Sequence, residues 1–170
     1  MIKAAAIFTD NMVLQRDKNI EIFGYTDEKE ISASINEINV SAEVKGNRGN
    51  AVFPPMQAGG PYTLTIKGSL QTIVYNNVMI GEVWLAGGQS NMELELQNCM
   101  GGKDFLANDK TENVRYYYTQ KNCNMDEKFF RDEENTGWSC FDSESARAWS
   151  AVAYFYAKEL AARLGVTVGI

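Results

Sequence analysis

The residues around Ser90 are the part of this sequence best suited to chemistry. Ser90 stands in "GGQSN", directly after the apolar run "VMIGEVWLAGG" (Val78–Gly88). A serine hydroxyl becomes a strong nucleophile when it is exposed, held rigidly and given a base that takes its proton. The end of a buried parallel strand supplies the exposure and rigidity, and Gly87 and Gly88 permit a tight turn there. The Ser90 N–H could also stabilise an oxyanion. The pattern predicts acyl transfer through a serine.

Two features of the sequence weigh against this prediction. The 170 residues contain no histidine, which is the usual base for such a serine. The general G-x-S-x-G elbow is not matched either, because Met92 occupies the position of its second glycine. The alternative is an ordinary polar loop after a strand, in which Ser90 or Asn91 caps the next helix.

Longer motifs favour the catalytic interpretation. The segment "GEVWLAGGQSNMELEL" (Gly81–Leu96) resembles the first block of the SGNH/GDSL hydrolases, in the branch of the sialate O-acetylesterases. "IFTDNMVLQRDKNIEIFGYT" (Ile7–Thr26) resembles the N-terminal opening of that family, and Trp149–Ile170 resembles the helix and strand that follow its nucleophile. The resemblance implies a β-rich, jelly-roll-like or sandwich-like N-terminal domain. It also implies the start of an SGNH-type α/β hydrolase domain that removes acetyl groups from sugars.

The resemblance assigns roles to a few residues only. Ser90 matches the nucleophile, and its N–H would be one oxyanion donor. Gln89 and Asn91 belong to the same block and would shape the turn together with Gly88. The family's Asp-x-x-His block has no counterpart here, so we expect a shortened chain with negligible esterase activity of its own.

Several alternatives stay open at this stage. A second polypeptide could supply the missing blocks, or the chain could be a non-catalytic carbohydrate-binding or structural β module with a vestigial hydrolase segment. The resemblance implies an O-acetylated sugar as substrate, with sialate esters first among the candidates. It implies no metal and no organic cofactor.

The elements that position Ser90 fall into two ranges. Residues 1–78 alternate apolar and polar side chains in short runs such as Ile31–Ile35 and Tyr62–Ile66, which is typical of an antiparallel β domain. Turn residues separate these runs, and Gly68–Ser69 could close a two-residue hairpin. Residues 79–170 are expected to form the incomplete α/β hydrolase domain.

The second range shows a βαβ alternation. The run Val78–Gly88 is continuously apolar and predicts a strand covered on both faces, and Asn113–Thr119 predicts another. A helix is expected over Ala146–Leu164, ended by Gly165 and followed by a strand at Val166–Ile170. The apolar stripe expected to face the core of this helix is Trp149, Val152, Ala153, Tyr156, Leu160 and Leu164.

Other candidate residues have simpler explanations. Glu93 and Glu95 could be an acid/base pair, but alternating carboxylates favour a solvated edge. The aromatic run Tyr116–Tyr118 could stack on a sugar, but aromatic residues in a strand usually pack against neighbours. The charged stretch Asn124–Asn135 could be an acidic binding loop, but its composition favours a solvated insertion, which an incomplete domain could leave disordered. Arg16 in "MVLQR" has no chemical role that the sequence explains.

Composition and charge exclude some classes of partner. The net charge is −6, which disfavours nucleic acid and anionic membrane surfaces. The cysteines Cys99, Cys123 and Cys140 have no metal-ligand spacing, and no leader segment is recognisable, so we expect a cytoplasmic protein. An unfinished parallel sheet predicts self-association, or partial disorder after about residue 95.

Overall fold

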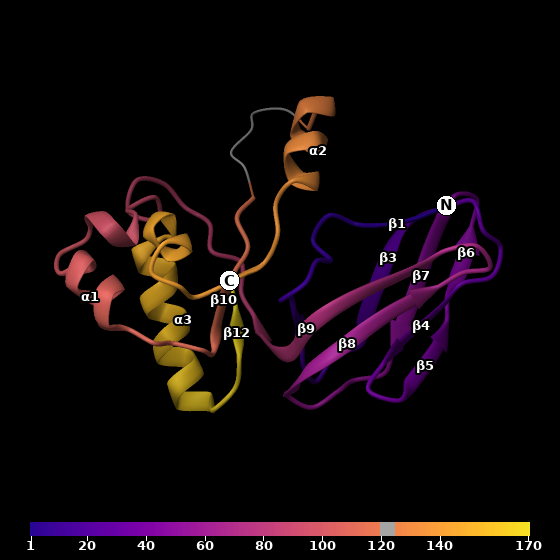
Figure 1. Ribbon diagram of the computed structural model, residues 1–170, viewed down its shortest axis with the longest axis horizontal. Helices are drawn as coiled ribbons and strands as arrows, with labels where there is room; N and C mark the ends of the chain where they lie inside the picture. Colours follow the sequence, from indigo (N-terminus) through magenta and orange to yellow (C-terminus); the bar gives the residue numbers. More distant parts are fainter. Residues whose placement is uncertain (120–124) are drawn as a thin grey trace.

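The computed structural model describes residues 1–119 and 125–170. The described chain is β-rich, with a β half at the N-terminus and a mixed α/β half that follows it (Figure 1). A four-stranded antiparallel sheet has the order β1-β3-β7-β6. Its strands are β1 (Ile2–Ala4), β3 (Ile20–Thr26), β6 (Glu43–Lys45) and β7 (Arg48–Phe53).

The second sheet has eight strands and extends through both halves. Its order is β11-β10-β12-β9-β8-β4-β5, and β2 pairs with β9. Its strands are β2 (Val13–Gln15), β4 (Ser32–Ile35), β5 (Ile38–Ser41), β8 (Gly59–Lys67), β9 (Thr72–Val83), β10 (Val114–Tyr116), β11 (Ser139–Cys140) and β12 (Val168–Gly169).

Between the two sheets of the β half lies one apolar core. Alternate residues of each strand point into it, such as Ile20 and Ile22 from β3 and Leu64 and Ile66 from β8. The period of two therefore predicted these strands correctly. Ile31–Ile35 corresponds to β4, and Tyr62–Ile66 lies inside β8.

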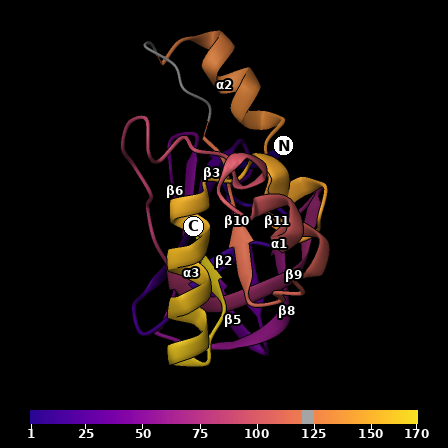
Figure 2. The ribbon, with the colours of Figure 1, turned by 90° about the vertical axis from the view of Figure 1, so that its left-hand side faces the viewer.

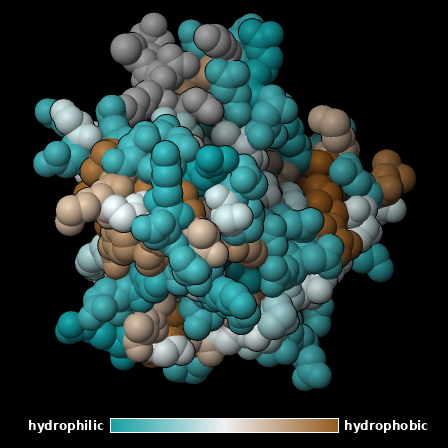
Figure 3. Space-filling model, turned by 60° about the vertical axis from the view of Figure 1, so that its left-hand side comes forward, coloured by the Kyte–Doolittle hydropathy of each residue, from teal (hydrophilic) through white to brown (hydrophobic). Residues whose placement is uncertain are grey.

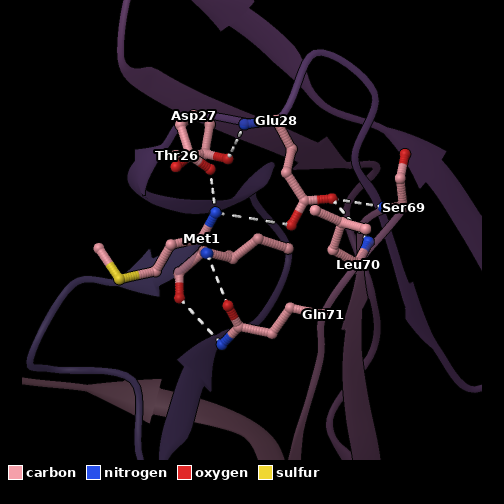
Figure 4. A network of polar contacts seen from close by, with 8 residues as sticks. Met1, Thr26, Asp27, Glu28, Ser69, Leu70 and Gln71 are labelled. Carbon is pink, nitrogen blue, oxygen red and sulfur yellow. Dashed lines mark hydrogen bonds and ion pairs between the residues drawn. The ribbon is translucent and has the colours of Figure 1, made fainter.

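The hairpin between β8 and β9 differs from the prediction. Lys67 pairs with Thr72, so the connection has residues 68–71 and not two residues. The Gly68 N–H donates to the Gln71 carbonyl at 2.9 Å. The buried Glu28 carboxylate also accepts from the backbone N–H of Ser69 and of Leu70, the latter at 3.1 Å (Figure 4).

Gln71 fixes the same turn to β1. Its side chain accepts from the Ile2 N–H at 2.8 Å and donates to the Ile2 carbonyl at 3.2 Å. Together with Glu28, this contact connects the two sheets at the end of the hairpin. The turn is thus held by side chains far away in sequence, which the local turn pattern could not reveal.

Strand β9 connects the two halves. Its first part pairs with β8 in antiparallel fashion, and its last residues pair with β12 in parallel. The expected domain boundary after residue 78 therefore lies within one continuous strand. The predicted strand Val78–Gly88 is wrong beyond Val83, because the parallel ladder ends where the Trp84 N–H donates to the Gly169 carbonyl at 2.9 Å. Coverage on both faces is also wrong at this end, where Leu85 is 98% exposed.

The α/β half consists of parallel strands and helices packed on them. Strands β9, β12 and β10 are parallel, and β11 adds antiparallel to β10. Helix α3 (Ala151–Leu164) packs on β10 and β12, as Figure 2 shows. The shorter helices of the described part are α1 (Gly102–Asn108), α2 (Glu127–Glu134) and the 3-10 turns η1 (Leu96–Asn98) and η2 (Ser145–Ala148).

Helix α3 starts later than predicted and buries a different face. Its N-cap is Ser150, whose hydroxyl accepts from the Ala153 N–H at 3.3 Å, so the range Ala146–Leu164 is interrupted. Of the predicted stripe, Val152, Tyr156 and Leu164 are exposed. The buried face consists of small residues and one tyrosine, namely Ala151, Ala153, Tyr154, Ala157 and Ala161. The expected C-cap is confirmed, because Gly165 has φ 65°.

The charged insertion is partly helical. Helix α2 begins after Asp126, whose carboxylate accepts from the Phe129 N–H at 3.0 Å. Asn124 lies outside the described residues. Among those residues, no helix combines the length and the apolar character needed to cross a membrane.

Two buried side chains join the halves. Arg115 on β10 donates to the carbonyl of Asn11 at 2.8 Å and to the Asn77 side-chain oxygen at 2.9 Å. Trp138 donates through its ring N–H to the Ile7 carbonyl at 2.9 Å. Both contacts hold the segment before β2 against the α/β half. Breaking them would leave buried polar groups without hydrogen bonds, which would cost folding free energy.

The surface of the α/β half is mostly hydrophilic, with apolar groups in separate patches. Figure 3 shows this with the α1 and α3 side turned forward. Val152, Phe155 and Tyr156 of α3 are each more than 40% exposed. These side chains are therefore not part of the core of the described chain.

Candidate active site

Ser90 lies on an exposed turn beyond the end of β9. The irregular segment 84–88 leads to this turn, which is closed by the Met92 N–H donating to the Gln89 carbonyl at 2.8 Å. The Glu93 N–H also donates to the Ser90 carbonyl at 3.2 Å. Within the described chain, no hydrogen bond engages the Ser90 hydroxyl or its backbone N–H. Both groups are thus free to interact with a substrate.

The prediction that Ser90 or Asn91 caps a helix is wrong. Residues 90–93 form a turn, and the next helical element, η1, starts only at Leu96 after Glu95. The polar residues of the block therefore do not serve as helix caps. Gly88, Gln89, Ser90 and Asn91 are all exposed and adjacent on this turn.

The far side of the turn is attached to the start of α3. The Leu96 N–H donates to the Trp149 carbonyl, and the Ala151 N–H donates to the Leu94 carbonyl, each at 2.8 Å. The Ser150 hydroxyl lies 3.3 Å from the Met92 sulfur. These contacts fix the exit of the turn, as β9 fixes its entrance, so the loop that carries Ser90 is held at both ends.

Gly81 allows the entrance strand to pack closely. A Cβ atom at Gly81 would lie 2.1 Å from the Thr167 carbonyl oxygen, which is far inside van der Waals contact. The Glu82 N–H donates to the same oxygen at 3.0 Å. Only glycine therefore permits β12 to pair with the strand that leads to Ser90.

Arg16 has a structural contact that the sequence did not reveal. Its Nε donates to the Glu82 carboxylate at 2.7 Å, and the two side chains are 24% and 19% exposed. Gln15 accepts from the Val83 N–H at 2.9 Å. The "MVLQR" and "GEVW" runs thus meet across β2 and β9. Arg16 therefore stabilises the strand end before Ser90 and has a positioning role. The sequence could not reveal this contact, because it depends on how β2 pairs with β9.

An open hollow lies beside this strand end. Its volume is about 430 Å³. It is lined by Gln15, Arg16, Asp17, Lys18, Glu82, Val83 and Trp84.

Glu95, one of the two carboxylates considered and set aside as an acid/base pair, has a structural contact. The Glu95 carboxylate accepts from the side chains of Gln97 at 2.7 Å and Asn98 at 2.9 Å, so it stabilises the turn at η1. Among the described residues, no titratable side chain forms a hydrogen bond with Ser90. The described chain therefore provides a candidate nucleophile without a base.

The aromatic run is mainly structural, as its strand position indicated. The Tyr116 ring stacks on Trp149 with centroids 4.9 Å apart and an interplanar angle of 9°. Tyr117 contacts Trp138, and Tyr118 is 46% exposed.

Cysteines and acidic residues form no recognisable metal centre in the described ranges. Cys99 and Cys140 are free thiols, and Cys123 lies outside the described residues. Residues 1–119 and 125–170 contain no group of three or more His, Cys, Asp or Glu side chains arranged to hold a metal ion.

Comparisons with known proteins agree with the motifs. The chain matches no established protein-family profile. It is similar to a sialate O-acetylesterase of Rattus norvegicus, with 30% identity over 103 residues, which is 56% of this chain and 19% of the relative. All of the chain also superposes on the crystal structure of a carbohydrate acetylesterase from Xanthomonas citri, with a TM-score of 0.87 and 28% identity, covering 39% of that protein. The chain therefore spans less than half of either protein, and the likeness to a sialate O-acetylesterase is confirmed.

Proposed function

We propose that this chain forms the nucleophile-bearing part of a carbohydrate O-acetylesterase. In this proposal residues 79–170 are the start of an SGNH-type hydrolase domain, and residues 1–78 are a jelly-roll-like or sandwich-like domain attached to it. The observation that carries the proposal is Ser90, exposed on a turn that is fixed at both ends and follows a parallel strand. The likeness to two acetylesterases supports it.

The proposed reaction is acyl transfer in two steps. A base takes the Ser90 hydroxyl proton while the Ser90 oxygen attacks the acetyl carbonyl. The protonated base then gives this proton to the sugar oxygen as the ester bond breaks, which leaves acetyl-serine. In the second step the base takes a proton from water, the water oxygen attacks the acetyl-serine, and acetate leaves while Ser90 regains its proton. The Ser90 N–H, which has no partner in the described chain, would donate to the oxyanion of each tetrahedral intermediate.

A base from outside these residues completes the mechanism. The 170 residues contain no histidine, and no carboxylate of the described chain is hydrogen-bonded to Ser90. We therefore propose that further residues, on a longer chain or on a second polypeptide, supply the base and the acid that orients it. The isolated 170 residues are expected to hydrolyse p-nitrophenyl acetate no faster than a Ser90→Ala variant does.

The substrate class follows from the relatives. One is named a sialate O-acetylesterase and the other a carbohydrate acetylesterase, so acetyl esters of sugars are the proposed substrates. Acetylated sialates and acetylated plant glycans are the two sets to compare. The sialate O-acetylesterase and the carbohydrate acetylesterase are both named for esterase activity, which favours a catalytic role over a non-catalytic module.

A chimera tests the proposal directly. Residues 1–170 replace the matching 39% of the Xanthomonas citri enzyme, whose remaining part supplies the residues that this chain lacks. The chimera is expected to release acetate from acetylated sugars. Ser90→Ala should lower its kcat by about 10⁴-fold or more. Without the nucleophile, the base and the acid that orients it have no group to activate, so their contribution to catalysis is lost as well.

Ser143→Ala is the matched control. Ser143 is also exposed on a turn of the α/β half, and its substitution should leave kcat unchanged. A folded chimera in which Ser90→Ala retains full activity would overturn the assignment of the nucleophile.

A further inference from the structure

The outer face of the four-stranded sheet carries exposed aromatic side chains. On β3, Ile20 and Ile22 point into the core, so Glu21, Phe23 and Tyr25 point outward. Phe23 is 49% exposed and Tyr25 is 53% exposed. These two half-exposed aromatic rings lie one pleat apart, and the exposed Val52 of β7 points to the same side opposite Glu21, so this side of the sheet carries an apolar surface.

Cationic residues flank Tyr25 in a single row. Lys3 lies opposite Tyr25, Tyr25 lies opposite Arg48, and Arg48 lies opposite Lys45. Residues directly opposite in antiparallel strands point to the same face. Because neighbouring strands are about 4.8 Å apart, the row is about 14 Å long. We call this row and the adjoining Phe23 the aromatic face.

Arg48 is the uncompensated charge of the aromatic face. Its guanidinium carbon lies 5.8 Å from the centroid of the Tyr25 ring. Lys3 is paired with Glu134 of α2, and Lys45 is paired with Glu43 at 2.8 Å. Arg48 forms no ion pair with any described residue, although the whole chain has a net charge of −6. Glu21 also points outward from β3, where its carboxylate accepts from the Asn50 side chain at 3.2 Å, so the unpaired positive charge is confined to the Tyr25–Arg48 end. At that end the charge favours an anionic ligand.

We propose that the aromatic face binds a saccharide that carries a carboxylate. The rings of Phe23 and Tyr25 would contact the apolar C–H face of the sugar ring. The Arg48 guanidinium would pair with the carboxylate through two parallel hydrogen bonds, the geometry that this side chain prefers. The choice of a saccharide rests on the proposed function, whereas the negative charge of the ligand follows from the face itself.

The location of this face makes it an accessory binding site and not part of the Ser90 site. The four-stranded sheet belongs to the β half, while Ser90 follows β9 at the start of the α/β half (Figure 1). Such a site would hold an acidic sugar chain on the protein while an acetyl group of the chain is removed elsewhere.

The test is a titration of the ¹⁵N-labelled 170-residue chain with sialyllactose, followed by amide chemical shifts. Lactose, which lacks the carboxylate, is titrated in parallel. Sialyllactose should shift amides of β3 and β7. Lactose should bind at least about tenfold more weakly than sialyllactose. Arg48→Gln and Tyr25→Ser should each weaken the binding of sialyllactose about tenfold. Arg48 and Tyr25 are exposed, so both variants should retain the dispersed spectrum of the folded chain.

Lys67→Gln is the control, because Lys67 is an exposed cation on β8 of the other sheet. It should bind sialyllactose as the parent chain does. Shifts that are absent, that cluster away from β3 and β7, or that persist undiminished in Arg48→Gln would overturn the proposal. So would a dimer that buries this face. Because binding and not turnover is measured, failure of the esterase proposal would leave this result unaffected.

Discussion

At the scale of single residues, the polar side chains divide into those that hold the fold and those that are free to act. Arg115, Glu28 and Asp109 each accept or donate several hydrogen bonds and connect distant segments. The Ser90 hydroxyl has no partner in the described chain and is exposed. A serine whose hydroxyl is hydrogen-bonded within the fold would have to break those bonds before it reacts, whereas Ser90 needs only a base.

Asp109 should make the stability of the chain depend on pH. Burial raises the pKa of this carboxyl, but the bonds from Lys158 at 2.8 Å, Tyr154 at 2.6 Å and Thr111 at 2.9 Å lower the pKa by more, so its net pKa is below the usual value. A folded pKa below the unfolded value of about 3.9 means that the carboxylate stabilises the fold above about pH 4. This contribution is lost as the pH falls through the folded pKa.

Asp109→Asn should therefore lower the free energy of unfolding by about 2 kcal/mol at pH 7. Below pH 4 the free energy of unfolding should fall less steeply for this variant than for the parent chain. Thermal unfolding from pH 2 to pH 8 measures both effects. Glu112→Gln, an exposed neighbour in the same loop, is the control. An identical pH profile for Asp109→Asn and the parent chain would contradict this account.

At the scale of elements, β9 is the strand on which the site depends. Its last residues pair with β12, and the turn that carries Ser90 follows it. Gln15 of the neighbouring β2 and Arg16, the residue that follows it, fix the same strand end. The position of Ser90 therefore depends on contacts made before the turn and not on the turn residues alone.

Gly81→Ala should disturb this strand end. The new Cβ would overlap with the Thr167 carbonyl oxygen, so β12 must move away from β9. We expect a loss of about 2 kcal/mol or more in the free energy of unfolding, measured by urea titration. Gly87→Ala is the matched control, because a Cβ there has no atom within 4 Å. Equal stability of the two variants would show that β12 does not pack on Gly81.

The sequence predicted elements well where one face of a strand is buried. β4 and β8 showed the period of two, and Gly165 marked the end of α3. The buried face of α3 was not predicted, because its alanines give weak hydropathy contrast while Val152 and Tyr156 are exposed. Only the part of β9 from Val78 onward was predicted, because the continuous apolar run that marked the strand begins there.

The candidate site was only partly predictable. Ser90 and its turn followed from a local motif that stays together in the structure. The contact between Arg16 and Glu82 joins residues far apart in the chain, and only the register of β2 against β9 brings them together. A base could not be predicted because the sequence contains no histidine.

At the scale of the whole molecule, two cores are connected by one long strand. The β half encloses its core between the two sheets, and the α/β half packs α3 on β10 and β12. The segment after β9 leaves Leu85 98% exposed, and the neighbouring Trp84 contacts the exposed Tyr156 of α3. An apolar surface of this kind beside a strand end favours association.

The isolated chain should therefore self-associate through this end. Sedimentation velocity is expected to show dimers or larger species that increase with concentration. Leu85→Lys should shift the distribution to monomer, because it places a charge on the apolar surface. Leu70→Lys, at a similarly exposed position on the β8–β9 hairpin, should leave the distribution unchanged. A concentration-independent monomer for the parent chain would contradict this prediction.

The central claim is that Ser90 is the nucleophile of an acetylesterase. Its most direct test is peptide mass spectrometry of the chimera with the Xanthomonas citri enzyme after reaction with a fluorophosphonate, which labels activated serines. We predict one phosphonyl adduct, on Ser90, and none on Ser143. A chimera that hydrolyses acetyl esters and carries the adduct on a different residue, or carries none, would contradict the claim.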